Sequence, residues 1–248
     1  MIGYLLGKVV GSTLIISLYA PTEELNKSRT LKYSLEKVGK HGKYALSFSA
    51  MSFVGWLSNY LERYLAASFI PMSGVGVYVA SAGLVNRPYN FLTSVLSTHF
   101  KPGVYSESSS SSSRSRIRAF GEWLSAAVIL GLFGTFCVYL FGHYIISIVL
   151  GAAVRKGAFA IILILSISGT AVIATHTVDN LIFAQGKSYH LLAPQLLAIF
   201  LLIALMPILY DRYGMIGVAV AKALCSMSNL VFTSVYAVII LRAARRDC

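Results

Sequence analysis

Charged side chains are scarce in this chain of 248 residues, where Asp, Glu, Lys and Arg together make up 12% of the sequence. That share is about half the ~25% of an ordinary soluble domain, and hydrophobic residues make up 56%. A soluble protein of this length needs a polar surface that this composition does not supply. Apolar runs of roughly 20 residues, long enough to cross a bilayer, recur along the chain. The composition therefore predicts an all-α, multi-pass integral membrane protein.

Acidic residues are the scarcer charged class, with 9 Asp and Glu against 21 Lys and Arg and a net charge of +12. In a soluble protein such an excess indicates nucleic-acid binding. Here the basic residues gather between the apolar runs, and the retention of Lys and Arg on the cytoplasmic side of a membrane explains them more simply. We predict membrane lipids as partners and no nucleic acid.

Cysteine and the common catalytic patterns are also missing. The three cysteines, Cys137, Cys225 and Cys248, fall in two apolar runs and the C-terminal tail, a spacing that suits neither a disulfide framework nor a metal site. The sequence has no paired-carboxylate site, no nucleophile elbow and no complete phosphate-cradling glycine fingerprint. We therefore expect no enzymatic activity, no metal and no cofactor.

Seven apolar runs predict seven transmembrane helices, at 2–20, 44–67, 74–98, 119–141, 158–185, 191–210 and 215–241. The segment 21–43 is the longest between runs, so we expect one lone helix followed by a six-helix unit at 44–241. The serine-rich stretch 106–116 predicts a flexible linker, because it has too few apolar residues to fold. A basic tail, 242–248, ends the chain.

The segments between the predicted helices carry charge unevenly. One side of the membrane holds fourteen basic residues: Lys27, Arg29, Lys32, Lys37, Lys40, Lys43, Lys101, Arg114, Arg116, Arg118, Lys187, Arg242, Arg245 and Arg246. The other side holds Arg155, Lys156 and Arg212. This bias predicts a protein of the cytoplasmic membrane with its N-terminus outside and its C-terminus in the cytoplasm.

Several short motifs recur in the order and spacing of a known family. Glu62 and Arg63 lie near the end of one predicted helix, and GVGVYVASAGL opens the next at 74–84. THFKPGVYSE, at 98–107, closes that helix, and DRYGMIGVAVAKA, at 211–223, leads into the last. Over roughly residues 40–242 this order resembles the C-terminal half of polysaccharide exporters, the O-antigen and lipid-linked oligosaccharide flippases of the multidrug/oligosaccharidyl-lipid/polysaccharide superfamily.

The resemblance implies a six-helix lobe and a function in polysaccharide export. Such a protein flips a lipid-diphosphate-linked oligosaccharide across the cytoplasmic membrane by alternating access between two lobes. Family members have about twelve helices, so seven helices imply a truncated or partial chain. The helix at 1–20 would then end a missing lobe, with 21–43 as the connector between lobes. Polysaccharide-assembly enzymes are further partners that the resemblance implies.

Ionisable residues inside the predicted spans are the candidate site residues, because each is costly in hydrocarbon unless it is paired or faces water. Arg63, Arg87 and Lys222 would form a positive substrate cavity, since guanidinium groups match phosphate oxygens well. Glu62 would orient Arg63 or carry a proton. For Glu62 and Arg63, structural pairing with other helices or side chains that reach toward the membrane surface stay open alternatives. For Lys222 the alternative is a side chain that reaches toward the surface. For Arg87, near the middle of its span, it is a buried structural partner.

Two further groups of polar residues lie within the spans. His176 and Asp179 are three residues apart on one helix face, a spacing that suits a proton relay, a cation site or a buried polar network. Asn59, Asn180 and Asn229 are expected to form interhelical hydrogen bonds.

Two other functions stay open beside the flippase. One is a multidrug exporter of the same superfamily, whose cavity would be aromatic and acidic to suit cationic drugs. The other is a non-transporting membrane subunit that scaffolds polysaccharide assembly.

Overall fold

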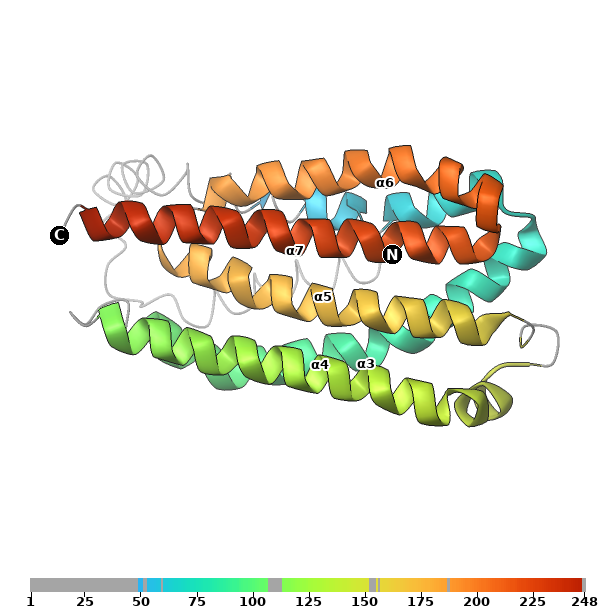
Figure 1. Cartoon of the computed structure of the whole chain (residues 1–248), viewed down its shortest axis with the longest axis horizontal. Helices are drawn as coiled ribbons and strands as arrows, with labels where there is room; N and C mark the ends of the chain where they lie inside the picture. The colour runs from blue at the N-terminus through green and yellow to red at the C-terminus, as the bar shows by residue number, and fades with distance from the viewer. Residues whose placement is uncertain are drawn as a thin grey trace, which may run out of the picture. The chain divides into compact units, whose positions relative to one another are not determined.

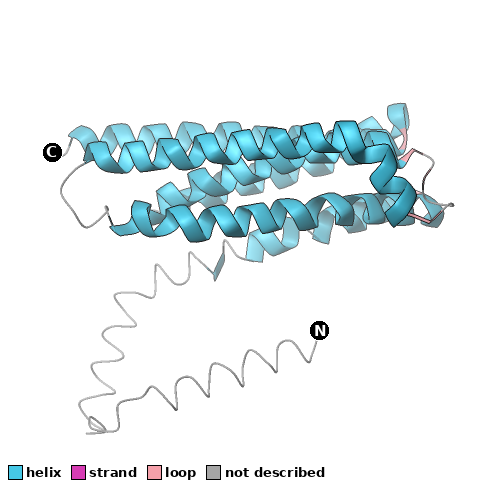
Figure 2. Ribbon diagram, turned by 90° about the horizontal axis from the view of Figure 1, so that it is seen from below, coloured by secondary structure: helices cyan, strands magenta, loops and turns pink. Residues whose placement is uncertain are grey.

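The computed structural model describes residues 49–50, 53–58, 60–106, 113–151, 155, 157–186 and 188–246. These residues belong to one compact unit, Leu46–Cys248. Their ordered elements are helices, with no strand among them (Figure 2). The all-α prediction is therefore confirmed for the described part of the chain. The predicted lone helix at 1–20 and the connector at 21–43 lie outside it.

Most of the helices with defined bounds are longer than the predicted spans. Those with defined bounds are α3 (Met72–Ser106), α4 (Ser113–Val149), α5 (Ala158–Ala184), the short 3₁₀ helix η2 (Ser188–Leu191), α6 (Leu192–Tyr213) and α7 (Met215–Arg246). Residues 53–58 and 60–69 are helical as well. Hydropathy marks the part of a helix that lies in lipid, whereas backbone hydrogen bonds continue into water until a turn residue stops them. The predicted loop at 99–118 is for this reason largely helical.

Four helices in the described part are long and apolar enough to cross a membrane: Ile117–Val149, Ala158–Ala184, Ser188–Tyr213 and Met215–Ile239. The chain is thus a membrane-embedded helical protein, but the predicted count of seven spans is not reproduced. Helix α3 occupies the predicted span at 74–98 without reaching this level of hydropathy. Its middle carries Asn86, Arg87 and Asn90, which lower the hydropathy of every window that contains them.

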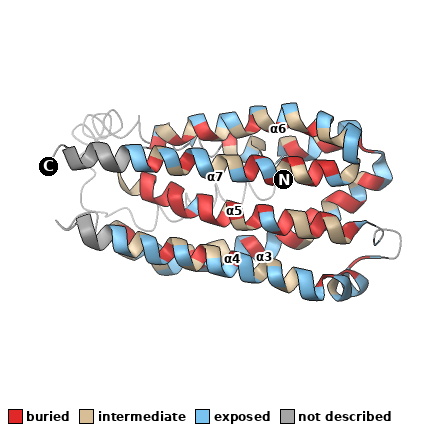
Figure 3. Cartoon of the chain, in the orientation of Figure 1, coloured by how far each residue is buried: buried red, intermediate tan, exposed pale blue. Residues whose placement is uncertain are grey.

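Helix α5 lies at the centre of the arrangement. It packs against α3, α4 and α7, and α6 packs against α7 (Figure 1). In the most apolar window of α5, 67% of the residues are buried, against 11% for α4, and Figure 3 shows the same contrast. The exposed face of α4 carries large apolar side chains such as Phe133 and Phe136. A surface of this kind is suited to lipid rather than to water.

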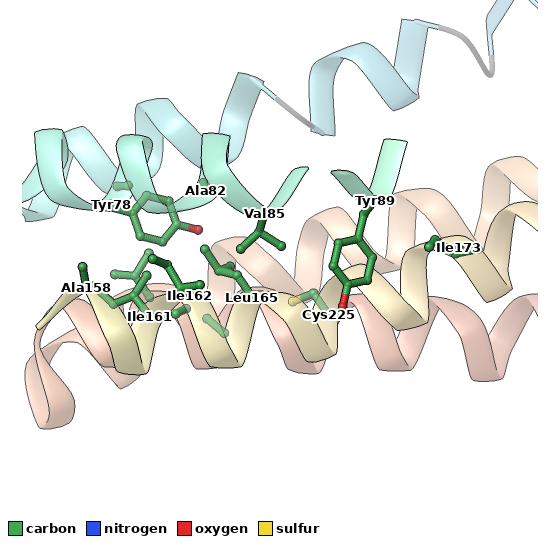
Figure 4. Close-up of a cluster of buried hydrophobic side chains, with 14 of the residues drawn as sticks. Tyr78, Ala82, Val85, Tyr89, Ala158, Ile161, Ile162, Leu165, Ile173 and Cys225 are labelled. Atoms are coloured by element: carbon green, nitrogen blue, oxygen red, sulfur yellow. The ribbon is translucent and has the colours of Figure 1, made fainter. Parts of the chain in front are cut away.

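Large side chains fill the space between α3 and α5. Tyr78 and Val85 of α3 lie toward Ile161 and Leu165 of α5, and Tyr89 lies further along the same interface (Figure 4). All five side chains are buried. Burial of aromatic and branched side chains against each other gives this interface its dispersion energy, which is the main attraction between helices in lipid.

Tyr89 also joins three helices, through its hydroxyl and its ring. The hydroxyl donates to the Gly131 carbonyl oxygen of α4 at 3.1 Å and lies 2.9 Å from the Thr135 hydroxyl. The ring of Tyr89 lies directly over Gly169 of α5, where an added Cβ would come within 2.6 Å of its Cδ1 atom. A glycine is therefore required at position 169 for α3 and α5 to approach this closely.

The turn between α6 and α7 depends on a glycine. Gly214 has φ 58° and ψ −138°, and its amide donates to the Tyr210 carbonyl oxygen at 2.8 Å. This backbone conformation is open almost only to glycine. The turn starts α7 directly after α6, so the two helices run antiparallel and in contact.

Candidate functional site

A buried carboxylate connects three helices. Tyr78 of α3 donates its hydroxyl proton to Glu62 Oε1 at 2.5 Å, and Lys222 Nζ of α7 lies 2.5 Å from Glu62 Oε2. The Glu62 residue is 6% exposed, and the side chain of Lys222 is 19% exposed. We call Glu62, Tyr78 and Lys222 the Glu62 triad. Both carboxylate oxygens have a donor, which is what allows this group to lie inside an apolar body.

The first turns of α7 bring Lys222 within reach of the carboxylate. Val218, Ala219 and Ala221 are fully buried around it, and Ala223 is nearly so. Small side chains let neighbouring helices approach closely, so the long lysine stem can cross to the helical segment 60–69. The predicted role of Glu62 in orienting Arg63 is not what the structure shows, because the partners of Glu62 are Tyr78 and Lys222. Adjacent residues of one helix point about 100° apart and do not meet.

The Glu62 triad borders the large cavity, a space of about 1020 Å³. Its walls come from residues 60–63, the middle of α3, residues 149–151, α5 and Lys222. The exposed polar face of α3, formed by Asn86, Arg87 and Asn90, lies along it. The four predicted substrate residues, Glu62, Arg63, Arg87 and Lys222, therefore share one cavity.

The large cavity carries excess positive charge. The charges of Glu62 and Lys222 offset each other, while Arg63 and Arg87 are exposed at its wall. The Arg63 guanidinium carbon lies 5.9 Å from the centre of the Tyr60 ring, a cation–π contact that leaves its N–H donors free for a ligand. Within the described residues, neither arginine has a carboxylate partner. Two such groups at one cavity attract anions.

A second space, the small chamber of about 210 Å³, lies beside the first. Its polar lining residues are Ser58, Thr175, His176, Asp179, Gln195, Lys222, Ser226 and Asn229, with Cys225 next to them. His176 and Lys222 line both spaces. The predicted pair His176 and Asp179 is thus brought to the small chamber, with His176 at the boundary between the two spaces.

Several acceptors in the small chamber lack donors. Asp179 is 6% exposed and has no ion pair in the described part of the chain. Gln195 Oε1 of α6 and Asn229 Oδ1 of α7 are buried without a hydrogen-bond partner there. The expected interhelical hydrogen bond of Asn229 is therefore not present at its oxygen. Asn180 was also expected to form an interhelical hydrogen bond, but it donates to the His176 carbonyl oxygen of its own helix at 2.7 Å. Asn59 lies outside the described residues.

Tyr78 and Gln195 were not among the predicted site residues. Neither is ionised at neutral pH, so a search for charged residues inside spans passes over both. Within the described ranges, no group of three or more His, Cys, Asp or Glu side chains could hold a metal ion. The two spaces offer charge and hydrogen bonding, which suits ligand binding.

The chain matches no protein-family model, no curated protein and no solved structure. The likeness to polysaccharide exporters therefore rests on the quoted motifs.

Proposed function

We propose that this protein binds a lipid-diphosphate-linked oligosaccharide in the large cavity and takes part in its movement across the cytoplasmic membrane. The observation that carries the proposal is the pair of exposed guanidinium groups, Arg63 and Arg87, at a cavity of about 1020 Å³ in a membrane-embedded helical body. Two exposed arginines in an apolar body are costly unless they serve a ligand or line a wet space.

The chemistry of the cavity wall suits each part of such a ligand. Guanidinium groups form paired hydrogen bonds with phosphate oxygens. Asn86 and Asn90 offer amide donors and acceptors beside Arg87, which match sugar hydroxyls. The polyprenyl tail would stay in the surrounding lipid.

In this proposal the cavity opens alternately to the two sides of the membrane, as two lobes rock about a site near the bilayer centre. His176 and Asp179, at the boundary of the small chamber, would couple a proton or a cation to that cycle. The C-terminus would lie in the cytoplasm, and enzymes of polysaccharide assembly would deliver the substrate.

The charge of the cavity argues against a multidrug exporter. A cavity for cationic drugs needs an available carboxylate, whereas Glu62 is already bonded to Lys222 and Tyr78. The remaining charges, on Arg63 and Arg87, would repel such drugs.

Binding of farnesyl diphosphate to the protein in phosphatidylcholine nanodiscs tests the substrate class. Farnesol, with the same apolar tail and no phosphate, should bind at least tenfold more weakly. Arg63→Gln and Arg87→Gln should each weaken farnesyl diphosphate about tenfold, because a hydrogen bond to a charged group contributes about 1.5–3 kcal/mol and 1.4 kcal/mol is a factor of ten.

Arg118→Gln is the matched control. Arg118 is an exposed arginine of α4 paired with Glu122, so its loss should leave binding unchanged. Equal affinities for farnesyl diphosphate and farnesol would contradict the proposal, and tight binding of tetraphenylphosphonium would favour the drug exporter instead.

Translocation is measured separately with a fluorescent farnesyl diphosphate in proteoliposomes, where dithionite quenches only the outer leaflet. Wild-type protein should deplete the protected pool, and Arg87→Gln should abolish this at unchanged protein content. Binding without translocation would favour a scaffold subunit.

A further inference from the structure

Three hydrogen-bond acceptor groups from three different helices line the small chamber. The Asp179 carboxylate, Gln195 Oε1 and Asn229 Oδ1 come from α5, α6 and α7. Both amide oxygens are buried without a partner in the described part of the chain, and Asp179 has no cation there. Unpaired buried acceptors are rare in folded proteins, because each gives up its hydration without compensation. A chamber of this kind is suited to a donor with several N–H groups.

Lys222 is such a donor and already borders the chamber. It lines both the large cavity and the small chamber. Its ammonium has three N–H groups, and Glu62 Oε2 is the one protein acceptor that the described residues give it. Lysine carries a compact charge on a flexible stem of four carbons, so the ammonium can move while the helix stays in place.

We propose that the small chamber is a second binding site for the ammonium of Lys222. In the first position, which the structure contains, the ammonium is bonded to Glu62 at the large cavity. In the second position it turns into the small chamber, where Asp179, Gln195 and Asn229 supply three acceptors for its three N–H groups. The move exchanges one carboxylate partner for another, so the lysine stays charged and paired throughout.

The two positions give the large cavity different charges. With Lys222 on Glu62, their charges offset each other, and Arg63 and Arg87 determine the potential. With Lys222 in the chamber, the Glu62 carboxylate remains beside the arginines with Tyr78 as its donor. The cavity is then less positive by one charge, which weakens its hold on an anion. This consequence for substrate release rests on the proposed function, whereas the second position itself does not.

Carbodiimide coupling detects the second position directly. Diisopropylcarbodiimide activates a carboxylate, and an amine in contact with it attacks the carbonyl carbon. An amide forms, the carboxylate oxygen leaves on the urea, and the protein loses one water. Mass spectrometry of peptides from the ligand-free protein in nanodiscs then distinguishes a Lys222–Glu62 product from a Lys222–Asp179 product.

Wild-type protein should give mainly the Lys222–Glu62 product. Glu62→Gln removes the first partner and should raise the Lys222–Asp179 product at least fivefold. Tyr78→Phe is a milder change that keeps all charges. It removes the donor that Glu62 retains when Lys222 is in the chamber, so it should lower the same product about twofold. Tyr89→Phe, which removes a buried hydroxyl of α3 that bonds to Gly131 and Thr135, is the control and should leave the ratio unchanged.

Double-mutant coupling provides a measurement that needs no reagent. A double-mutant cycle of Lys222→Met and Asp179→Asn gives a coupling constant for the unfolding equilibrium. This constant should be about tenfold larger in the Glu62→Gln background than in the wild type. Absence of the Lys222–Asp179 product together with an unchanged coupling would overturn the second position.

Exchanging the dissolved cation tests whether Lys222 or a free cation occupies the small chamber. The product ratio should be the same in sodium chloride and in choline chloride. Loss of the Lys222–Asp179 product in sodium alone would show that a dissolved cation occupies the chamber, which would also overturn the proposal. No lipid diphosphate is present in these experiments, so their failure would leave anion binding by Arg63 and Arg87 standing, and failed anion binding would leave the second position standing.

Discussion

Replacing Lys222 by Met removes one charge of the Glu62 triad and keeps an unbranched side chain of similar length. The Glu62 side chain is only 8% exposed, so its carboxylate would be left with Tyr78 as its donor and without a cation. Breaking a buried ion pair on one side costs about 3–5 kcal/mol. The large cavity gives Glu62 some access to water, so we expect a loss of about 2–3 kcal/mol in the free energy of unfolding.

Glu62→Gln should cost less, about 1–2 kcal/mol, because the amide oxygen still accepts a hydrogen bond and Lys222 has acceptors in the small chamber. The double variant Glu62→Gln/Lys222→Met should be more stable than the sum of the two losses predicts, by about 1–2 kcal/mol. Equilibrium unfolding in mixed micelles with increasing dodecyl sulfate measures all three variants.

Arg118→Met is the control for this series, since it breaks an exposed ion pair of α4 and should change stability by about 0.5 kcal/mol or less. Additive losses in the double variant, or a Lys222→Met variant as stable as this control, would refute the view that the triad holds three helices together.

Two further predictions concern the helix packing around the site. Gly169→Ala places a methyl group against the ring of Tyr89 and should destabilise the protein by about 1–3 kcal/mol. Its control, Gly121→Ala, has open space around the added methyl group and should be neutral or slightly stabilising. Equal effects of the two variants in a thermal unfolding assay would contradict the close approach of α3 and α5. Gly214→Ala forces a side chain into a backbone conformation with φ 58° and ψ −138° and should cost about 1–3 kcal/mol; a variant with unchanged melting temperature would show that the turn between α6 and α7 has another form.

The sequence correctly predicted features that depend only on neighbouring residues. The apolar run that predicted a helix at 158–185 corresponds to α5, Ala158–Ala184, because hydropathy and a glycine at each end are properties of neighbouring residues. The run at 74–98 shows the limit of the same reasoning. It is helical as predicted, but the polar residues that serve the cavity lower its hydropathy, so a functional face makes a span harder to recognise.

Contacts between residues that are far apart in the sequence could not be predicted in the same way. For Glu62 the sequence left open a role in orienting Arg63, a proton-carrying role and a structural pairing with another helix, and it did not identify Lys222 and Tyr78 as the partners. Asn229 looked like an ordinary interhelical hydrogen-bonding residue, yet its Oδ1 lies unpartnered in the small chamber. Both outcomes depend on which faces of distant helices meet.

The sequence by itself determined that this protein is helical and embedded in a membrane, and it identified the ionisable residues inside the helices. These properties follow from composition and from runs of neighbouring residues, and they need no knowledge of the packing. Only the tertiary structure decided that Lys222 neutralises Glu62, that Arg63 and Arg87 remain available at one cavity, and that a second polar chamber lies beside it. When every face of a helix is apolar, hydrophobic periodicity no longer marks an inner side, so the contacts between helices follow from close packing of small and large residues that are far apart in the chain.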